Sequence, residues 1–288
     1  MRSHQPAVNG ESNPASVIYS IGGVATNVAR RLAEEVPTVL LSATGSDDES
    51  RLLQGQLRLL AAASDNGFHC EFQQFDNCAA DLYVAIQMPD GQLAMGASST
   101  TAIEQLTAEW ALTAMQQRSV TASWLVLDSN LSAETIQALA RSHAGSCIGL
   151  GVSAAKIRRL APSLADLDVI FMNRQEAAVL ADVPPDTAPS DLIVALANSG
   201  LRAAVITDKQ HPVTVFDDGR SLSLKLPSPG PDELPITGTG TDNGAGDALA
   251  AATITGISRG ESLGDSVAQH GMPAARQVLC GKSSPPGR

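Results

Sequence analysis

The sequence predicts an α/β fold in which a mostly parallel β-sheet is covered by helices. Short apolar runs alternate with amphipathic helical stretches along most of the chain, as parallel strands joined by crossover helices require. The apolar runs also end near polar residues, and no internal repeat is visible. The 288 residues can form one large α/β core or two modest domains, and we expect one main domain.

Five apolar runs are the predicted strands, and three amphipathic stretches between them are predicted helices. The strands cover residues 38–45, 122–129, 146–152, 168–173 and 203–208. The helices cover residues 25–35, 132–144 and 174–183. Ser132 is a plausible N-cap, although the strict capping box is missing. The polar residues at the carboxyl ends of the strands mark the edge where α/β enzymes place ligands.

Residues 68–97 break this alternation, because β-rich segments flank the turn sequence Pro-Asp-Gly-Gln. We expect a hairpin-bearing insert that forms a small lid. Residues 1–15 and 281–288 are rich in Ser, Pro, Asn and Gly, so we expect both ends to be loose. The main domain would then span residues 16–280.

Composition disfavours several classes of function. No apolar run reaches the ~18 residues of a membrane span. The net charge of −11 disfavours a broad surface for nucleic-acid polymers, although a ligand of nucleoside size stays compatible with it. The four cysteines have no metal-ligand spacing, and no secretory signal is visible at the start. We therefore expect a soluble cytoplasmic protein with buried thiols.

The most informative motif is Gly-Ala-Gly-Asp at residues 244–247, directly before a helix of small residues. Gly244 and Gly246 can adopt backbone angles that let successive N–H groups converge on one anion. Asp247 then lies in the first helical turn, where its carboxylate can take a proton from an attacking hydroxyl. The alternative is a glycine loop with an aspartate cap on a buried helix.

Two other elements accompany this motif. Gly22 and Gly23 precede the first predicted helix, and Asn27 can hydrogen-bond sugar hydroxyls one turn later. The alternative is a Gly-Gly turn before a surface helix. Asn173 and Glu176 follow a predicted strand at a spacing that can hold hydrated Mg²⁺, but a capping box explains the same spacing.

Three further residues are open to two interpretations each. Lys156 follows a predicted strand and is either a cation near a triphosphate or, as we favour, a solvated helix residue. Asp128 and Asn130 lie at the end of another predicted strand, where they either reach the substrate cleft or cap the following turn. The sequence pattern favours neither role for this pair.

The order of the motifs GGVATNVA, NRQEA and GAGDA along the chain resembles the ribokinase-like, or PfkB, family of carbohydrate kinases. The resemblance covers nearly the whole chain. Several segments, GESNPA, LLSATGSDDESRLL, LVLDSNLSAET and VSAAKIRRLAPSLADLDVIFMN, resemble more narrowly the pseudouridine kinases.

The resemblance implies a three-layer α/β/α domain with a β-sheet lid. It implies transfer of the γ-phosphoryl group of ATP to the 5′-hydroxyl of pseudouridine, with Asp247 as the base. The backbone N–H groups of Gly244, Ala245 and Gly246 would form the anion hole. The lid would exclude water, which competes as a phosphoryl acceptor.

The same resemblance assigns binding residues and partners. The residues assigned to binding of the sugar are Gly22, Gly23 and Asn27. The residues assigned to ATP and Mg²⁺ are Asn173, Glu176 and Thr207, and among these Glu176 would bind the metal. The implied partner is a small nucleoside or sugar. A requirement for a monovalent cation and a lid-mediated homodimer are both left open by the sequence.

Departures from the family pattern lead to two alternatives. Family members usually open with a strand that carries an acidic substrate residue, whereas this chain reaches the SNP segment by residue 14. We therefore expect a truncated N-terminus and an unfilled position in the sheet. Residues 241–243 add an acid before the motif, and residues 208–210 replace the glycines expected after Thr207. The alternatives are a kinase of another sugar or nucleoside, or a catalytically weak binding or regulatory relative.

Overall fold

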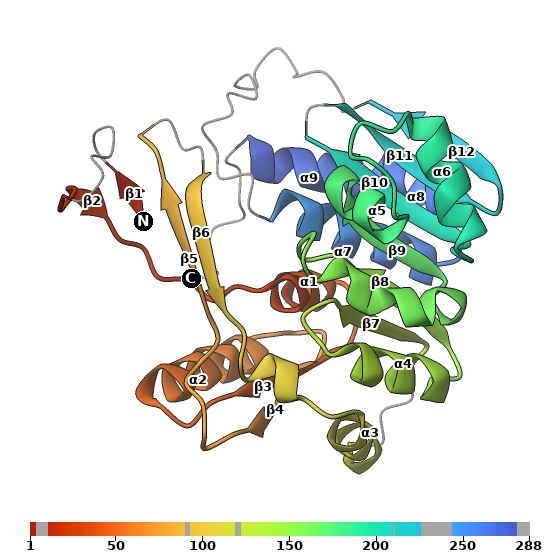
Figure 1. The fold of residues 1–288 in the computed structure, drawn as a ribbon. Coiled ribbons are helices and arrows are strands. Elements are labelled where there is room, and N and C mark those ends of the chain that lie inside the picture. The colour runs from red at the N-terminus through yellow and green to blue at the C-terminus, as the bar shows by residue number, and fades with distance from the viewer. Residues whose placement is uncertain (4–10, 90–92, 119–121, 210, 226–243, 281–288) are drawn as a thin grey trace.

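A six-stranded mixed sheet lies at the centre of the computed structural model, with helices on both of its faces (Figure 1). The structure describes residues 1–3, 11–89, 93–118, 122–209, 211–225 and 244–280. The strands in spatial order are β12 (Arg220–Leu224), β11 (His211–Asp217), β10 (Ala203–Asp208), β9 (Val169–Asn173), β8 (Ser146–Leu150) and β7 (Trp124–Asp128). Strands β7 to β10 are parallel, and β11 and β12 add an antiparallel edge.

Helices connect the strands, and local sequence features start several of them. The α-helices are α1 (Val24–Leu32), α2 (Asp48–Ala62), α3 (Ala108–Gln117), α4 (Ala133–Ser142), α5 (Arg174–Leu180), α6 (Pro189–Asn198), α7 (Ala245–Ser258), α8 (Leu263–Ser266) and α9 (Met272–Leu279). The 3₁₀ helices η1 (Ile103–Gln105) and η2 (Ile157–Asp166) and the π-helix η3 (Val267–Gly271) complete the set that the structure describes. Ser132, the predicted N-cap of α4, accepts a hydrogen bond from the Thr135 N–H.

The central strands bury alternate residues against opposite helix layers, which is why their sequences are apolar throughout. In β9, Val169 and Phe171 pack in a cluster with residues of α1, α7, α8 and α9. Ile170 and Met172 pack in a second cluster with residues of α3, α4, α5 and α6. The predicted three-layer α/β/α arrangement is confirmed.

The sheet is interrupted beside β7. Strands β3 (Thr38–Thr44) and β4 (Phe68–Gln74) form a separate parallel pair, and within the described residues β3 does not pair with β7. Residues 38–43 and 122–128 instead line one cavity of about 1880 Å³. A position between β3 and β7 is therefore unfilled by the described part of the chain. With β3, all five predicted strands are present.

A second sheet carries the lid. β5 (Leu82–Gln87) and β6 (Leu93–Ser99) form an antiparallel hairpin that stands beside the helical body in Figure 1. β1 (Arg2–Ser3) pairs in parallel with β5, and β2 (Ala15–Ser16) pairs antiparallel with β1. The lid sheet therefore combines the hairpin with the start of the chain.

The predicted insert at residues 68–97 divides between two sheets. Its first segment is β4, which pairs with β3, and its later segments are the lid hairpin. Met1–Ser3, in the segment expected to be loose, contributes to the lid sheet. Residues 90–92 of the predicted turn and the expected loose tail at 281–288 lie outside the described residues.

The structure bears on two expectations from composition. None of the helices in the described part of the chain combines the length and the apolar character of a membrane span. All four cysteines are free, and the expectation of buried thiols holds for Cys147 alone, because Cys70, Cys78 and Cys280 are only partly buried. Burial raises the pKa of the Cys70 and Cys147 thiols to about 11, so these two side chains are poor nucleophiles at neutral pH.

Candidate active site

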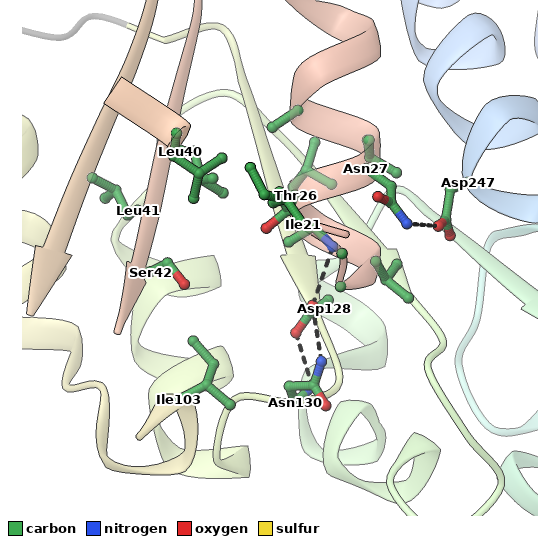
Figure 2. A pocket seen from close by; sticks show the side chains of 18 of the residues that line it. Ile21, Thr26, Asn27, Leu40, Leu41, Ser42, Ile103, Asp128, Asn130 and Asp247 are labelled. Carbon is green, nitrogen blue, oxygen red and sulfur yellow. Dashed lines mark hydrogen bonds between the residues drawn. The ribbon is translucent and has the colours of Figure 1, made fainter. Parts of the chain in front are cut away.

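Asp247 and Asn27 come together from opposite ends of the chain. Asn27 Nδ2 on α1 donates a hydrogen bond of 2.7 Å to Asp247 Oδ2 on α7, although 220 positions separate the two residues (Figure 2). Both side chains line the cavity that also reaches between β3 and β7. The predicted base and the predicted sugar-binding asparagine therefore share one site.

Two glycine helix starts open into the same cavity. Gly244, the N-cap of α7, has φ +96°, and Gly23, the N-cap of α1, has φ +101°. Both angles lie in the region that glycine adopts without strain. Neither helix start has a side-chain cap, and Gly22, Gly23 and Gly244 line the cavity. The first N–H groups of α7 can therefore serve an anion in the cavity.

Gly246 lies in the first turn of α7 and has space around it. Among the described residues beyond its chain neighbours and its own helix, a side chain at Gly246 would meet no atom within 4 Å, and neither would one at Gly244. The described protein therefore gives no packing reason for glycine at position 246. Close approach of a ligand to the helix start is the remaining physical reason.

The surroundings of Asp247 shift the pKa of its carboxyl group. Loss of solvent raises the pKa of this carboxyl above its ordinary value, and the negative charge of Asp128 adds to the rise. The hydrogen bond from Asn27 and the positive charge of Arg31 act in the opposite direction. A carboxylate with a raised pKa accepts a proton more readily than an exposed one, as a general base requires.

Asp128 and Asn130 fulfil both roles that the sequence left open. Asp128 Oδ1 accepts the Asn130 N–H at 2.9 Å, which caps the turn after β7. Asp128 Oδ2 accepts from Asn130 Nδ2 at 3.2 Å and more weakly from the Ala25 N–H at 3.4 Å. Both residues also line the cavity (Figure 2). Burial raises the pKa of Asp128.

Lys156 does not have the solvated position that we favoured from the sequence. Its side chain is 15% exposed, and its ammonium group lines the cavity. Nζ donates to Thr100 Oγ1 at 2.8 Å and to Asn130 Oδ1 at 2.9 Å. Thr100 was missed by the sequence analysis, because no local pattern shows that the exit of the lid hairpin contacts η2.

The predicted Mg²⁺ and ATP residues lie together, but outside the cavity lining. Asn173 and Glu176 form a complete capping box at the start of α5, with bonds of 2.9 and 2.8 Å. Thr207 pairs with Asn173 across β9 and β10. Glu176 is 3% exposed, and burial raises its pKa. No group of three or more His, Cys, Asp or Glu side chains in the described residues is placed to hold a metal ion.

The acid that follows Thr207 is paired. Asp208 lies 3.8 Å from Arg174 Nε and 3.2 Å from His211 Nδ1. The positive charge of Arg174 offsets part of the negative charge of Asp208. The extra acid that the sequence places near the phosphate path, in residues 241–243, lies outside the described residues.

Comparison with known proteins identifies related folds. A family model described as pfkB family carbohydrate kinase matches residues 3–282. A carbohydrate kinase from Agrobacterium tumefaciens is 24% identical, with a TM-score of 0.75 over 98% of this chain and 87% of that one. A ribokinase from Thermotoga maritima is 16% identical, with a TM-score of 0.71 over 96% and 88%.

A nucleoside kinase shares the fold as well. The adenosine kinase of Anopheles gambiae, solved with P1,P4-di(adenosine-5) tetraphosphate, is 18% identical, with a TM-score of 0.72 over 93% of this chain and 83% of that one. A search of curated proteins found no match. At these identities the solved structures establish the fold, which is ribokinase-like.

Proposed function

The chain belongs to the pfkB family of carbohydrate kinases, and from this premise we propose that it phosphorylates the 5′-hydroxyl of pseudouridine. That it is a carbohydrate or nucleoside kinase follows from the family. The observation that supports the proposed site most directly is the 2.7 Å bond from Asn27 to Asp247 beside an uncapped glycine helix start. The choice of pseudouridine depends on the segments that resemble pseudouridine kinases.

In this proposal Asp247 takes the proton of the substrate hydroxyl, and Asn27 orients the carboxylate. The N–H groups of Gly244, Ala245 and Gly246 stabilise negative charge at the start of α7. Gly22 and Gly23 let the sugar approach the backbone of α1 closely. These residues account for proton removal and for charge stabilisation, which are the two tasks of the protein in phosphoryl transfer.

The candidate residues fit ATP better than they fit Mg²⁺. ATP supplies the phosphoryl group, and Mg²⁺ neutralises charge on its oxygens. The uncapped start of α7 fits an anion. Glu176 fits Mg²⁺ less directly, because its Oε2 accepts the Asn173 N–H within the capping box. We therefore assign Asn173, Glu176 and Thr207 to the edge of the nucleotide site, with Glu176 acting through metal-bound water. A monovalent cation has no assigned ligands.

The alternative substrate is another sugar or nucleoside. The related solved structures include a ribokinase and an adenosine kinase, so the fold is compatible with both kinds of acceptor. The alternative of a weak binding or regulatory relative is supported by the unfilled sheet position next to the site.

The test measures Mg-ATP-dependent phosphorylation of pseudouridine, with uridine, ribose and fructose alongside. We expect turnover of pseudouridine and a loss of about 10²–10⁴-fold in Asp247→Asn. If another substrate is turned over faster than pseudouridine, the substrate assignment changes, while the assignment of Asp247 as the base stands. Absence of turnover with every substrate would favour the non-catalytic alternative.

We also propose a homodimer formed through the lid sheet in a cytoplasmic setting. Leu82, Tyr83 and Met95 on the lid are each more than half exposed. Such exposed apolar side chains favour association with a second surface. Light scattering of the wild type and of Tyr83→Lys tests this proposal. A monomeric wild-type protein at all concentrations would contradict it.

A further inference from the structure

A charged network connects the exit of the lid hairpin to the loop after β7. Lys156 Nζ donates to Thr100 Oγ1, directly after β6, and to Asn130 Oδ1, two residues after Asp128. Glu104 of η1 lies 3.4 Å from the same ammonium group. Three segments that are distant in sequence therefore meet at one nitrogen atom.

Each hydrogen-bonding group in this network has a defined role. Thr100 Oγ1 accepts from Lys156 and donates to Glu104 Oε1 at 2.9 Å. Asn130 Oδ1 accepts from Lys156, so its Nδ2 is free to donate to Asp128 Oδ2. The lysine thus fixes the orientation of the Asn130 amide, and the amide in turn contacts the buried carboxylate of the site.

Arg159 supports the network from outside the cavity. Its Nη1 donates to the Asn130 carbonyl at 2.7 Å, and its Nη2 donates to Glu104 at 3.0 Å. Among the Lys and Arg side chains in the described part of the chain, Lys156 and Arg118 line the cavity, and Arg118 pairs with Glu71. The charge of Lys156 is the one that acts on Asp128.

The position of Lys156 links lid placement to the site. Asp81, just before β5, accepts the N–H groups of Ala102 and Ile103 and so anchors the entry of the lid to η1. Lys156 anchors the exit, since Thr100 follows β6. The positive charge of Lys156 also favours the ionised forms of Asp81 and Asp128.

We propose that Lys156 is a positioning residue that holds the exit of the lid hairpin against the Asn130 loop and thereby sets the closed geometry of the substrate site. The link to substrate rests on the proposed kinase function. The role of Lys156 in the placement of the lid is independent of the kinase function, and a separate experiment measures it.

The first experiment compares amide hydrogen exchange in wild type, Lys156→Met, Thr100→Val and Arg158→Met. Arg158→Met is the matched control, because Arg158 lies in the first turn of η2, two residues after its N-cap Lys156, carries the same charge and forms an exposed pair with Asp182. We expect residues 98–105 to exchange about tenfold faster in Lys156→Met, since two hydrogen bonds to a charged donor are lost. Thr100→Val, which removes the acceptor for Lys156 together with the hydrogen bond to Glu104, should show a change in the same direction.

The second experiment measures kinetics with pseudouridine and Mg-ATP. Lys156→Met should raise KM by about tenfold with a smaller change in kcat, and Lys156→Arg should restore part of the loss. Unchanged exchange in both Lys156→Met and Thr100→Val would overturn the proposal, and so would an equal effect of Arg158→Met. If the wild type shows no turnover but the exchange result holds, the proposed function fails while the role of Lys156 in the lid stands.

Discussion

The carboxylate of Asp247 is partly buried, and its loss of solvent has a consequence for stability. Because its folded pKa is raised above the unfolded value, ionisation costs the folded state free energy once the pH exceeds about 4. Asp247→Asn removes that cost. We expect the variant to be more stable than wild type at pH 8 by about 1 kcal/mol, or roughly 2–4 °C in Tm.

The difference should disappear near pH 3, where the carboxyl is protonated in both the folded and the unfolded state. Thermal unfolding of wild type and of Asp247→Asn between pH 3 and pH 8 measures this difference in stability. An Asp247→Asn variant that is less stable than wild type at pH 8 would show that the carboxylate stabilises the fold, contrary to its burial.

Asn27 should control the pH range in which Asp247 acts as a base. Its hydrogen bond is the strongest of the influences that lower the Asp247 pKa. Asn27→Ala should therefore raise that pKa and move the acidic limb of kcat/KM to higher pH. The pH profiles of the variant and of Asn198→Ala, an exposed asparagine on α6, test this. Identical acidic limbs of the pH profiles would show that Asn27 does not lower the pKa of Asp247.

At the scale of elements, what could be predicted depends on how local the cause is. The helix start at Ser132 and the capping box of Asn173 and Glu176 follow from residues within three positions of one another. The burial of Lys156 depends on Thr100 and Asn130, which are 56 and 26 positions away. The pairing of β1 with β5 is equally non-local. Sequence patterns carry the first kind of information and lack the second.

Two glycines at the start of α7, Gly244 and Gly246, allow an effect on stability to be separated from an effect on activity. Gly244→Ala should cost about 1 kcal/mol, because φ +96° is unfavourable for a residue with a side chain. Gly246→Ala should leave the fold as stable or up to about 1 kcal/mol more stable, since glycine weakens a helix interior. A methyl group at position 246 should nevertheless reduce turnover by obstructing the anion site. Denaturant unfolding and kinetics together measure both effects, and an active Gly246→Ala enzyme would remove position 246 from the site.

The start of α5 separates capping from metal binding. Glu176→Gln keeps an acceptor for the Asn173 N–H and removes the charge, whereas Glu176→Ala also removes this bond of the capping box and leaves the Asn173 side chain as the cap. We expect the alanine variant to lose about 1 kcal/mol of stability and the glutamine variant to lose less. Both should need more Mg²⁺ for half-maximal activity if the carboxylate acts through metal-bound water. Unchanged Mg²⁺ dependence in both variants would leave Glu176 as a helix cap alone.

At the scale of the whole molecule, the interruption between β3 and β7 distinguishes this sheet from a continuous one. Figure 2 shows Leu40, Leu41 and Ser42 of β3 across the cavity from Asp128. An unfilled position in the sheet was expected from the sequence, but the pattern of residues carries no information on where in the sheet it lies. In the described part of the chain the interruption lies beside Asp128 and Asn130, and Asn130 contacts Lys156, so the interruption borders the candidate site.

Amide hydrogen exchange should reveal the interruption directly. In a strand with neighbours on both sides, nearly all N–H groups are hydrogen-bonded, whereas a strand with one neighbour leaves alternate N–H groups to solvent. We therefore expect alternate amides of β3 and β7 to exchange at least about a hundredfold faster than those of β9, which is paired on both sides. The matched control is β8, also paired on both sides and adjacent to β7. Uniform protection of β7 equal to that of β9 would mean that the edge is covered in solution, and the cavity between β3 and β7 would then not persist.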